Sequence, residues 1–403
     1  MKELIKKFIP KFLLNWYHYS LAVLAKWFYN NPSKKMIIIG VTGTSGKSSS
    51  CYFISQILNA ANIKTGLSTT TLFNDGKKEW LNDKKMTMLG RFQTQKLLRS
   101  MLRNKCMVAV VETSSQGIEQ YRHIGIDYNF LIFTNLYPEH IEAHGSFENY
   151  KLAKGKLFEH LNKSLKNKKT IIANRDDEHA DYFLSFKADK KITYGLNEGD
   201  IIWKDYKLNL LGEYNKYNIL AGVAVAQELK INKEKINQAI ANLKPLPGRL
   251  EFIANNLDIK IIVDYAFEPQ AITKLYQTIK NIKHNKIIHI LGSTGGGRDK
   301  SRRPELGKLA RENADIIIIT NEDPYDENPM TIINEVAAGV GEKAIKILDR
   351  REAIKKALEM AQKNDLVLVT GKGAEQAIIV KNNKKIAWDD RKVIKEELQK
   401  VSN

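Results

Sequence analysis

The chain has 403 residues, which exceeds the size of one ordinary hydrophobic core and predicts two or three domains. Hydrophobic residues make up 43% and charged residues 27%, the balance of a water-soluble globular protein. The two cysteines, Cys51 and Cys106, are too few for a disulfide framework or a zinc cluster and fit a reducing cytoplasm. The formal net charge of +19 admits nucleic acid, anionic lipid or a polyanionic substrate. No nucleic-acid reader motif accompanies this charge, so nucleic acid is not expected as a partner.

The first 35 residues form a separate compositional segment. Basic and aromatic residues dominate it: Lys2, Lys6, Lys7, Lys11, Phe12, Trp16, Tyr17, Tyr19, Trp27, Phe28 and Tyr29. Asn15, His18 and Lys26 interrupt the apolar stretch, so it falls short of the roughly 18 apolar residues of a spanning helix, and no cleavage site marks a signal peptide. Lysines beside tryptophan and tyrosine favour a helix, within residues 1–30, that lies peripherally on the inner face of a membrane. A helix that packs its aromatic side chains onto the neighbouring domain fits the same pattern.

From residue 36 onwards, short β-branched runs alternate with helical segments. Strands are expected at 36–39, 107–111, 130–133 and 170–173. This alternation predicts a parallel sheet covered by helices, with ligands at the carboxyl ends of the strands. Residues 190–211 are rich in turns and predict a small antiparallel extension.

The Pro-Leu-Pro-Gly break at 245–248 marks a domain boundary. Beyond it we expect strands at 260–264, 286–291, 315–320 and 365–370, and helices at 303–313, 329–338 and 350–364. The fold class is therefore α/β, with a Rossmann-like C-terminal domain. The expected divisions are an N-terminal segment at 1–35, a central domain at 36–246 and a C-terminal domain at 247–403.

A glycine-rich turn follows the first expected strand. Gly40-Val41-Thr42-Gly43-Thr44-Ser45-Gly46-Lys47-Ser48 leads into a helical segment that ends near Ala61. Such a turn cradles phosphate, because backbone N–H groups point inward, Lys47 reaches the phosphates and Ser48 can ligate Mg²⁺. The strict P-loop pattern fails at Val41, where it requires a glycine. The nucleotide contacts expected here are Gly43, Thr44, Gly46, Lys47, Ser48 and Ser49.

The wording Gly-x-Thr-Gly-Thr-x-Gly-Lys-Ser resembles the nucleotide loop of the Mur ligases, ATP-dependent enzymes that join amino acids to peptidoglycan precursors. Further motifs similar to this family follow in the family's order: Glu112-Thr113-Ser114-Ser115, Glu139-His140, His144-Gly145, Ala153-Lys154 with Leu157-Phe158, Asn215 with Asn218, Pro247-Gly248-Arg249, Asp264-Tyr265-Ala266, Arg298-Asp299-Lys300, Arg303-Pro304, Gly371-Lys372-Gly373-Ala374-Glu375 and Asp389-Asp390-Arg391. The run at Glu112 looks like the branch that makes UDP-N-acetylmuramoyl-tripeptide. Each motif alone is compatible with an ordinary turn, but their order is not accidental. Family members usually carry an N-terminal domain for the uridine nucleotide. This chain offers only about 35 residues there, so we expect uridine recognition to be truncated or performed differently.

The resemblance implies ATP, Mg²⁺ and a carbamylated lysine as the chemical requirements. The implied catalytic residues are Lys47, Glu112, His140 and Lys154. The implied metal ligands are Ser48, Glu112, His140 and carbamylated Lys154, since carbamylation turns a cation into an anionic oxygen donor. The implied nucleotide contacts beyond the glycine-rich turn are Asn215, Asn218, Arg249 and Asp264. The implied contacts to the substrates, a UDP-N-acetylmuramoyl-peptide and an amino acid, are Thr69, Thr70, Ser114, Arg298, Asp323, Tyr325, Gly371 and Glu375.

Two departures leave the substrate open. Diaminopimelate-adding relatives carry Asp-Asn-Pro-Arg where this chain has Glu322-Asp323-Pro324-Tyr325, and a phenol cannot make the charged fork of an arginine. Lysine or another amino acid therefore stays possible. Phe267 replaces the histidine of the family's Asp-Tyr-Ala-His motif. The alternatives are a ligase for another carboxylate, such as a folylpolyglutamate-type acceptor, or a membrane-associated P-loop ATPase, although an ATPase would not require Lys154.

Overall fold

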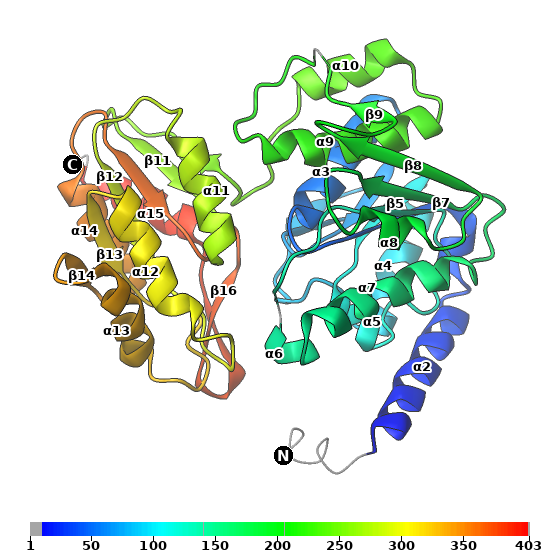
Figure 1. Cartoon of the computed structure of the whole chain (residues 1–403), viewed down its shortest axis with the longest axis horizontal. Helices are drawn as coiled ribbons and strands as arrows, with labels where there is room; N and C mark the ends of the chain where they lie inside the picture. The colour runs from blue at the N-terminus through cyan, green and yellow to red at the C-terminus, as the bar shows by residue number, and fades with distance from the viewer. Residues whose placement is uncertain (1–9, 140, 205, 402–403) are drawn as a thin grey trace. The chain divides into compact units, whose positions relative to one another are not determined.

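The structure is a computed structural model that describes residues 10–139, 141–204 and 206–401 (Figure 1). The chain divides into two compact units, Met1–Lys244 and Pro245–Asn403, and the division falls at the start of the Pro-Leu-Pro-Gly break. Each unit has its own sheet covered by helices and its own core. The expected α/β class, with a parallel-dominated central sheet and a second C-terminal α/β unit, is confirmed.

A nine-stranded sheet, in the order β4-β3-β2-β5-β1-β6-β7-β8-β9, forms the first unit. Its strands are β1 (Ile37–Thr42), β2 (Thr65–Ser68), β3 (Leu72–Asn74), β4 (Glu79–Leu81), β5 (Val108–Glu112), β6 (Phe130–Phe133), β7 (Thr170–Asn174), β8 (Lys190–Gly195) and β9 (Ile201–Ile202). The pairs from β2 to β9 are parallel, and only β3 and β4 add antiparallel pairs at the opposite edge. The strand expected at 36–39 continues to Thr42, because β6 pairs with it up to that residue.

The antiparallel extension expected at 190–211 is wrong. Helix α8 (Ala180–Leu184) lies between β7 and β8 in the chain, so the chain crosses over and β8 pairs parallel to β7. β9 continues the sheet in the same direction. The turn chemistry of the segment indicated a hairpin, whereas the crossover decides the strand direction.

Helices cover this sheet and bury its apolar strands. The helices of this unit are α2 (Lys11–Phe28), α3 (Lys47–Ala60), α4 (Arg91–Arg103), α5 (Ser115–Glu119), α6 (Ile141–His144), α7 (Phe147–Leu161), α8, α9 (Tyr214–Glu228) and α10 (Lys233–Ala241), with the 3₁₀ turn η1 (Pro32–Lys35). Continuous apolar runs such as that of β6 are typical of strands buried on both faces. No helix within the described ranges is long and apolar enough to cross a bilayer.

The second unit is built on a six-stranded sheet in the order β10-β11-β15-β12-β13-β14. Its strands are β10 (Glu251–Phe252), β11 (Lys260–Val263), β12 (Ile287–Leu291), β13 (Ile316–Ile319), β14 (Ala344–Lys346) and β15 (Leu366–Val369), with a separate ribbon of β16 (Ala377–Val380) and β17 (Lys384–Ala387). Only β10 pairs antiparallel within the larger sheet. Side chains alternate between two cores, as Leu366 and Leu368 join one cluster while Val367 and Val369 join the other.

The helices of the second unit are α11 (Pro269–Ile279), α12 (Arg302–Asn313), α13 (Pro329–Val340), α14 (Arg350–Met360) and α15 (Asp390–Val401), with the 3₁₀ turn η2 (Lys381–Asn383). The helix expected at 350–364 ends four residues earlier, because Ala361 is extended and Asn364 adopts a left-handed φ of 68°. In both units the loops that follow the parallel strands gather at the carboxyl edge of the sheet. Glu112 at the end of β5 and Asp264 just after β11 lie at that edge.

Candidate active site

The turn between β1 and α3 contains a glycine in a left-handed conformation and is hydrogen-bonded to the loop after β6. Gly46, the residue before α3, has a left-handed φ of 76°, and a Cβ there would collide with the side-chain oxygen of Asn218. The Thr44 N–H donates to the Asn135 carbonyl at 2.8 Å, and the Ser45 N–H donates to Asn135 Oδ1 at 2.9 Å. Lys47 Nζ donates to the Thr44 carbonyl at 2.7 Å. This strand–turn–helix has the form of a phosphate cradle.

Glu112, the last residue of β5, gathers partners from two other loops. Ser48 Oγ donates to Glu112 Oε2 at 2.7 Å. The Thr70 N–H donates to the same oxygen at 2.8 Å, and Thr70 Oγ1 donates to Oε1 at 2.9 Å. The structure thus brings together three of the expected residues across separations of 64 and 42 positions. Thr69 differs, since its hydroxyl donates to the Leu72 carbonyl at 2.8 Å within its own turn.

Lys154, on the buried face of α7, is only 1% exposed. Its Nζ donates to the Gly43 carbonyl at 2.6 Å and lies 4.4 Å from the ring centre of Tyr150. Burial lowers the pKa of Lys154 well below its ordinary value; the charge of Lys47 adds to this shift, and Glu112 opposes it. The environment therefore favours an uncharged amine beside the phosphate cradle.

The remaining expected residues of the first unit flank this cluster. Asn218 Oδ1 accepts from Ser50 Oγ at 3.2 Å, and Asn218 Nδ2 donates to Asn215 Oδ1 at 3.4 Å, so the asparagine pair of α9 rests on α3. Ser49 is buried in the first turn of α3. Ser114 caps α5 by accepting from the Gly117 N–H at 3.2 Å. His140 lies outside the described residues.

The donor set suits a hard cation. Among the described residues, no three histidine, cysteine, aspartate or glutamate side chains come together as a metal cluster. Ser48 and Glu112 nevertheless place a hydroxyl and a carboxylate next to each other at the mouth of the cradle, and oxygen donors of this kind are those that Mg²⁺ prefers. A carbamate on Lys154 would add further oxygen. These residues fit Mg²⁺, with fewer protein ligands than an all-protein cage.

In the second unit, Asp264 and Arg249 lie at the end of β11. Asp264 is buried and accepts from the N–H groups of Leu250 at 2.6 Å and Ala266 at 2.7 Å. Burial raises the pKa of Asp264, while Arg249 and these hydrogen bonds oppose the shift. The Arg249 guanidinium stacks 4.0 Å from the ring centre of Tyr265. Two expected nucleotide contacts are therefore neighbours.

Lys372 organises the expected amino-acid side of this unit. Its Nζ donates to Asp323 Oδ1 at 2.8 Å and to Glu375 Oε2 at 2.7 Å. Burial opposes the charge of Lys372, yet these two carboxylates outweigh it and raise the pKa of Lys372. Gly371 precedes it with a φ of 100°, and a Cβ there would lie 2.5 Å from Glu322 Oε2. The ammonium therefore stays charged and fixes both carboxylates.

Tyr325 also belongs to this cluster. It has a left-handed φ of 53°, and its ring lies against Gly296, where a Cβ would come within 2.7 Å of Tyr325 Cδ2. Burial raises the pKa of Tyr325; Asp323 adds to the shift, and Arg298 opposes it. The phenol is thus neutral at physiological pH and within electrostatic reach of Arg298.

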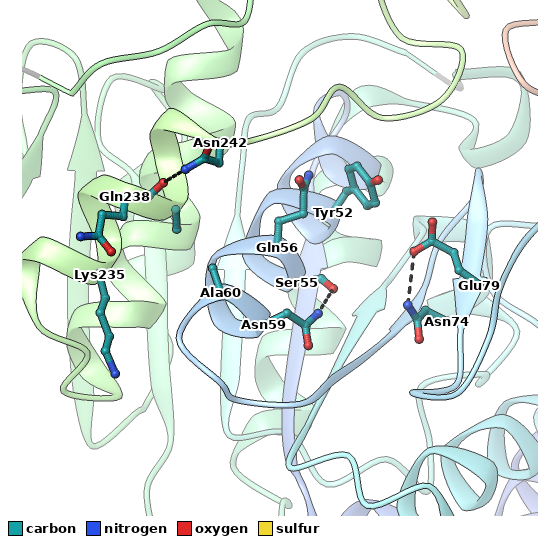
Figure 2. Close-up of a pocket in the computed structure, with 11 residues that line it drawn as sticks. Tyr52, Ser55, Gln56, Asn59, Ala60, Asn74, Glu79, Lys235, Gln238 and Asn242 are labelled. Atoms are coloured by element: carbon teal, nitrogen blue, oxygen red, sulfur yellow. Dashed lines mark hydrogen bonds between the residues drawn. The ribbon is translucent and has the colours of Figure 1, made fainter.

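A polar groove of about 410 Å³ lies elsewhere in the first unit (Figure 2). Its walls come from α3, α10 and the β3–β4 hairpin: Tyr52, Ser55, Gln56, Asn59, Ala60, Asn74, Glu79, Lys235, Gln238, Ala239 and Asn242. Several of these polar groups bond to one another, as Asn74 does to Glu79 at 3.2 Å and Asn59 does to Ser55 at 3.3 Å. The groove contains none of the residues expected from the motifs, so its volume alone gives it no role.

Comparison with known proteins agrees with this geometry. The Mur ligase middle domain matches residues 41–226, and the glutamate ligase domain of Mur ligases matches residues 248–373. UDP-N-acetylmuramoyl-L-alanyl-D-glutamate--2,6-diaminopimelate ligase 1 of Clostridium acetobutylicum is 33% identical over 410 residues, which cover 95% of this chain and 82% of that protein. The chain belongs to the Mur ligase family. Members of this family are ATP-dependent ligases.

Other relatives of this Mur ligase extend the likeness. UDP-N-acetylmuramyl-tripeptide synthetase of Borreliella afzelii is 34% identical over 398 residues, covering 91% of this chain and 78% of that protein. A solved UDP-N-acetylmuramoyl-L-alanyl-D-glutamate--2,6-diaminopimelate ligase is 28% identical, with a TM-score of 0.60 over 91% of this chain and 79% of that one. Folylpolyglutamate synthase of Mycobacterium tuberculosis reaches a TM-score of 0.69 over 87% of this chain and 92% of its own, but at 15% identity it shares only the fold.

Three residues that the motifs did not assign complete the clusters of this Mur ligase. Asn135 accepts hydrogen bonds from the cradle, and in the sequence it stands just after an apolar strand, in the stretch that leads to Glu139-His140, without an assigned role. Tyr150 lies one helical turn before Lys154, a spacing that puts both on one face. Lys372 stands between two glycines with positive φ. Its motif was recognisable, but its role as the partner of two carboxylates was not.

Proposed function

We propose that this Mur ligase uses ATP to join an amino acid to a UDP-N-acetylmuramoyl-peptide in the synthesis of peptidoglycan precursors. The bond pattern of Ser48 and Thr70 around Glu112, beside the cradle and the buried Lys154, carries the proposal. Relatives that are about a third identical over more than nine-tenths of the chain have names that describe this reaction, which supports the choice of substrates.

The reaction has two steps. The terminal carboxylate of the peptide attacks the γ-phosphorus of ATP, which forms an acyl phosphate and releases ADP. The amine of the amino acid then attacks the acyl carbon, loses a proton and expels phosphate, so an amide forms. Lys47 and the N-terminus of α3 at the cradle oppose the charge of the transferred phosphoryl group. Mg²⁺, when bound, supplies further charge neutralisation on the phosphates.

We assign the metal-holding role to Ser48, Glu112, His140 and Lys154. A lysine amine must be uncharged to attack CO₂, and the burial that lowers the pKa of Lys154 favours that form. Carbon–nitrogen bond formation then releases one proton and leaves an anionic carbamate, whose oxygens can serve as hard ligands. The position of Nζ, against the Gly43 carbonyl, puts such a group next to the phosphate cradle.

We assign the nucleotide to the cradle residues with Asn215, Asn218, Arg249 and Asp264, as expected from the motifs. The amino acid is assigned to the cluster of Arg298, Asp323, Tyr325, Gly371 and Glu375. Lys372 already neutralises Asp323 and Glu375 in part, so these two carboxylates form a polar, oriented pair. Thr70 and Ser114 remain proposed acceptor contacts, whereas the bond from Thr69 to Leu72 makes that hydroxyl a weaker candidate.

The test measures phosphate release from ATP with purified full-length protein. UDP-N-acetylmuramoyl-dipeptide is combined with a panel of amino acids that includes lysine and diaminopimelate. We expect release to require both the acceptor and an amine. Hydrolysis at the full rate without either would favour the simple ATPase, and turnover only with a folate-type acceptor would move the enzyme to the other ligase class.

We also propose that the enzyme works in the cytoplasm and attaches peripherally to the inner face of a membrane through residues 1–30. The lysine- and aromatic-rich composition of this segment supports the attachment. Of these residues, 1–9 lie outside the described part of the chain, so the structural argument concerns α2.

A further inference from the structure

Helix α2 presents its large apolar side chains to solvent. Nine of them are exposed: Phe12, Leu13, Trp16, Tyr17, Tyr19, Val23, Leu24, Trp27 and Phe28. The exposed fraction reaches 69% for Phe12 and 78% for Trp27. At about 100° of rotation per residue, all nine fall within about half of the helix circumference. We call these nine residues the outer face of α2.

The opposite side of α2 is mostly small and polar, with the half-buried Leu14 and Leu21 at its margin, and it holds the helix to the first unit. Ala22 and Ala25 are completely buried, and α2 packs on α4. Gly125 approaches the helix so closely that a Cβ there would lie 3.0 Å from Lys26 Cβ. Lys26 Nζ pairs with Asp127 at 3.5 Å, and Asn31, just beyond the helix, donates to the same carboxylate at 2.9 Å. The polarity of a normal surface helix is therefore inverted.

Packing onto the neighbouring domain, the alternative that the sequence left open, does not account for the outer face. Tyr19 contacts the ring of Tyr121 at 6.2 Å between centres, and Phe28 contacts Phe92 at 6.0 Å. Both side chains nevertheless stay exposed. In Figure 1 the N-terminal half of α2 extends beyond the other helices of its unit. Such a contiguous apolar surface marks an interaction site.

The charges around the outer face indicate which partner covers it. Helix α2 contains no aspartate or glutamate, and its Lys26 pairs with Asp127 on the protein side. The guanidinium of Arg91 lies within electrostatic reach of Tyr17. A helix with exposed tryptophan and tyrosine and without acidic residues, in a chain with a net charge of +19, matches anionic headgroups above an acyl layer.

We infer that the outer face of α2 inserts, with the helix flat, into one leaflet of an anionic phospholipid membrane and fixes the first unit at its surface. This inference rests on the peripheral attachment proposed above and gives it a face, an orientation and a lipid class. A flat orientation follows because the nine apolar side chains lie along one side of α2 from its first turn to its last. The small and polar side remains on the protein, so binding does not require the helix to leave its unit.

The experiment compares full-length protein with a Trp16→Glu/Trp27→Glu variant in sedimentation with vesicles. The vesicles contain either phosphatidylcholine alone or phosphatidylcholine with phosphatidylglycerol. We expect the unmodified protein to bind the anionic vesicles about tenfold more strongly, and the double variant to lose about tenfold or more of that binding. Met107→Glu is the matched control, because Met107 is another exposed apolar side chain of the first unit, and it should leave binding unchanged. Equal binding by the double variant would overturn the inference.

Two further measurements separate the other outcomes. Light scattering without vesicles tests a second copy of the chain as the occupant; a dimer that the double variant abolishes, with no vesicle binding, would overturn the membrane assignment. Quenching of tryptophan emission by brominated lipid tests insertion in the unmodified protein. This measurement does not depend on the double variant, so it stays valid if that variant folds poorly. Protein that binds vesicles without quenching of its tryptophan emission would also overturn the inference that α2 inserts. Ligation without vesicles should be equal in both proteins, so its absence in the unmodified enzyme would count against the proposed ligase function alone.

Discussion

At the scale of single residues, we expect substitution of Lys154 to lower the catalytic activity strongly. Its Nζ is buried beside the Gly43 carbonyl, away from water. We predict that Lys154→Ala lowers kcat by about a hundredfold or more, because the metal site loses an oxygen donor. Bicarbonate or a short carboxylic acid should restore part of the rate. Phosphate release with both substrates is the measurement.

The control for this prediction is Lys156→Ala on the same helix. Lys156 is exposed and pairs with Glu119 at 2.6 Å, a surface ion pair that contributes little. It should keep the unmodified rate. An active Lys154→Ala enzyme that ignores added carboxylate would remove the metal-holding role of this lysine.

Tyr325 gives the specificity test, since the resemblance of Glu322-Asp323-Pro324-Tyr325 to the family's Asp-Asn-Pro-Arg motif puts Tyr325 in the place of the arginine. An arginine that binds a carboxylate contributes roughly 1.5–3 kcal/mol, or about ten- to a hundredfold in selectivity. We predict weak discrimination between diaminopimelate and lysine, and a shift of kcat/KM towards diaminopimelate in Tyr325→Arg. Tyr325→Phe is the control and should not shift this ratio. Strong preference for diaminopimelate in the unmodified enzyme, unaffected by the arginine, would show that this loop does not read the side chain.

At the scale of elements, the β1–α3 turn depends on a glycine that no other residue replaces well. Gly46→Ala forces a side chain into a left-handed φ and against Asn218. We predict a rise of about tenfold or more in the KM for ATP. Gly90→Ala is the matched control, because Gly90 also precedes a helix, α4, but has an ordinary φ of −58° and a nearest neighbour at 3.6 Å. An unchanged KM in Gly46→Ala would mean that the turn tolerates the rearrangement.

At the scale of the whole molecule, each unit encloses a neutral histidine, and this links stability to pH. Burial lowers the pKa of His123 in the first unit and of His289 in the second to about 3. The unfolded chain binds these protons near the ordinary value of 6.5, so the folded state is fully favoured only above that pH. Stability falls as the pH drops from 6.5 towards 3, by about 1.4 kcal/mol per pH unit for each histidine.

We therefore predict that unfolding in urea shows a clear loss of stability between pH 7.5 and pH 5.5. His289 Nδ1 contacts the Tyr276 hydroxyl at 2.6 Å and His289 Nε2 contacts that of Thr370 at 2.9 Å. His289→Gln keeps hydrogen-bonding groups but cannot bind the proton, so it should reduce the pH slope. His284→Gln, at a partly exposed histidine, is the control. An equal slope in His289→Gln and the unmodified protein would contradict the buried-histidine mechanism.

What the sequence determined by itself is the part of the site that is local. The strand, the turn with Gly46 and the helix that starts at Lys47 are contiguous, so apolar runs and glycine spacing predict them directly. The α/β class and most strands of both units follow for the same reason, because buried parallel strands read as short apolar runs. The order of the motifs also identified the family before any geometry was known.

The tertiary structure alone decided what depends on residues that are distant in the chain. Ser48 and Thr70 meet Glu112 because parallel strands bring the segments that follow them to one edge. Lys154 meets the Gly43 carbonyl, 111 positions away, because it lies on the buried face of α7. The direction of β8 depended on the preceding crossover through α8 rather than on local turn residues. The exposure of the outer face of α2 was likewise not predictable from the sequence. Periodicity indicates that a helix has an apolar and a polar side, but it does not indicate which side packs against the protein.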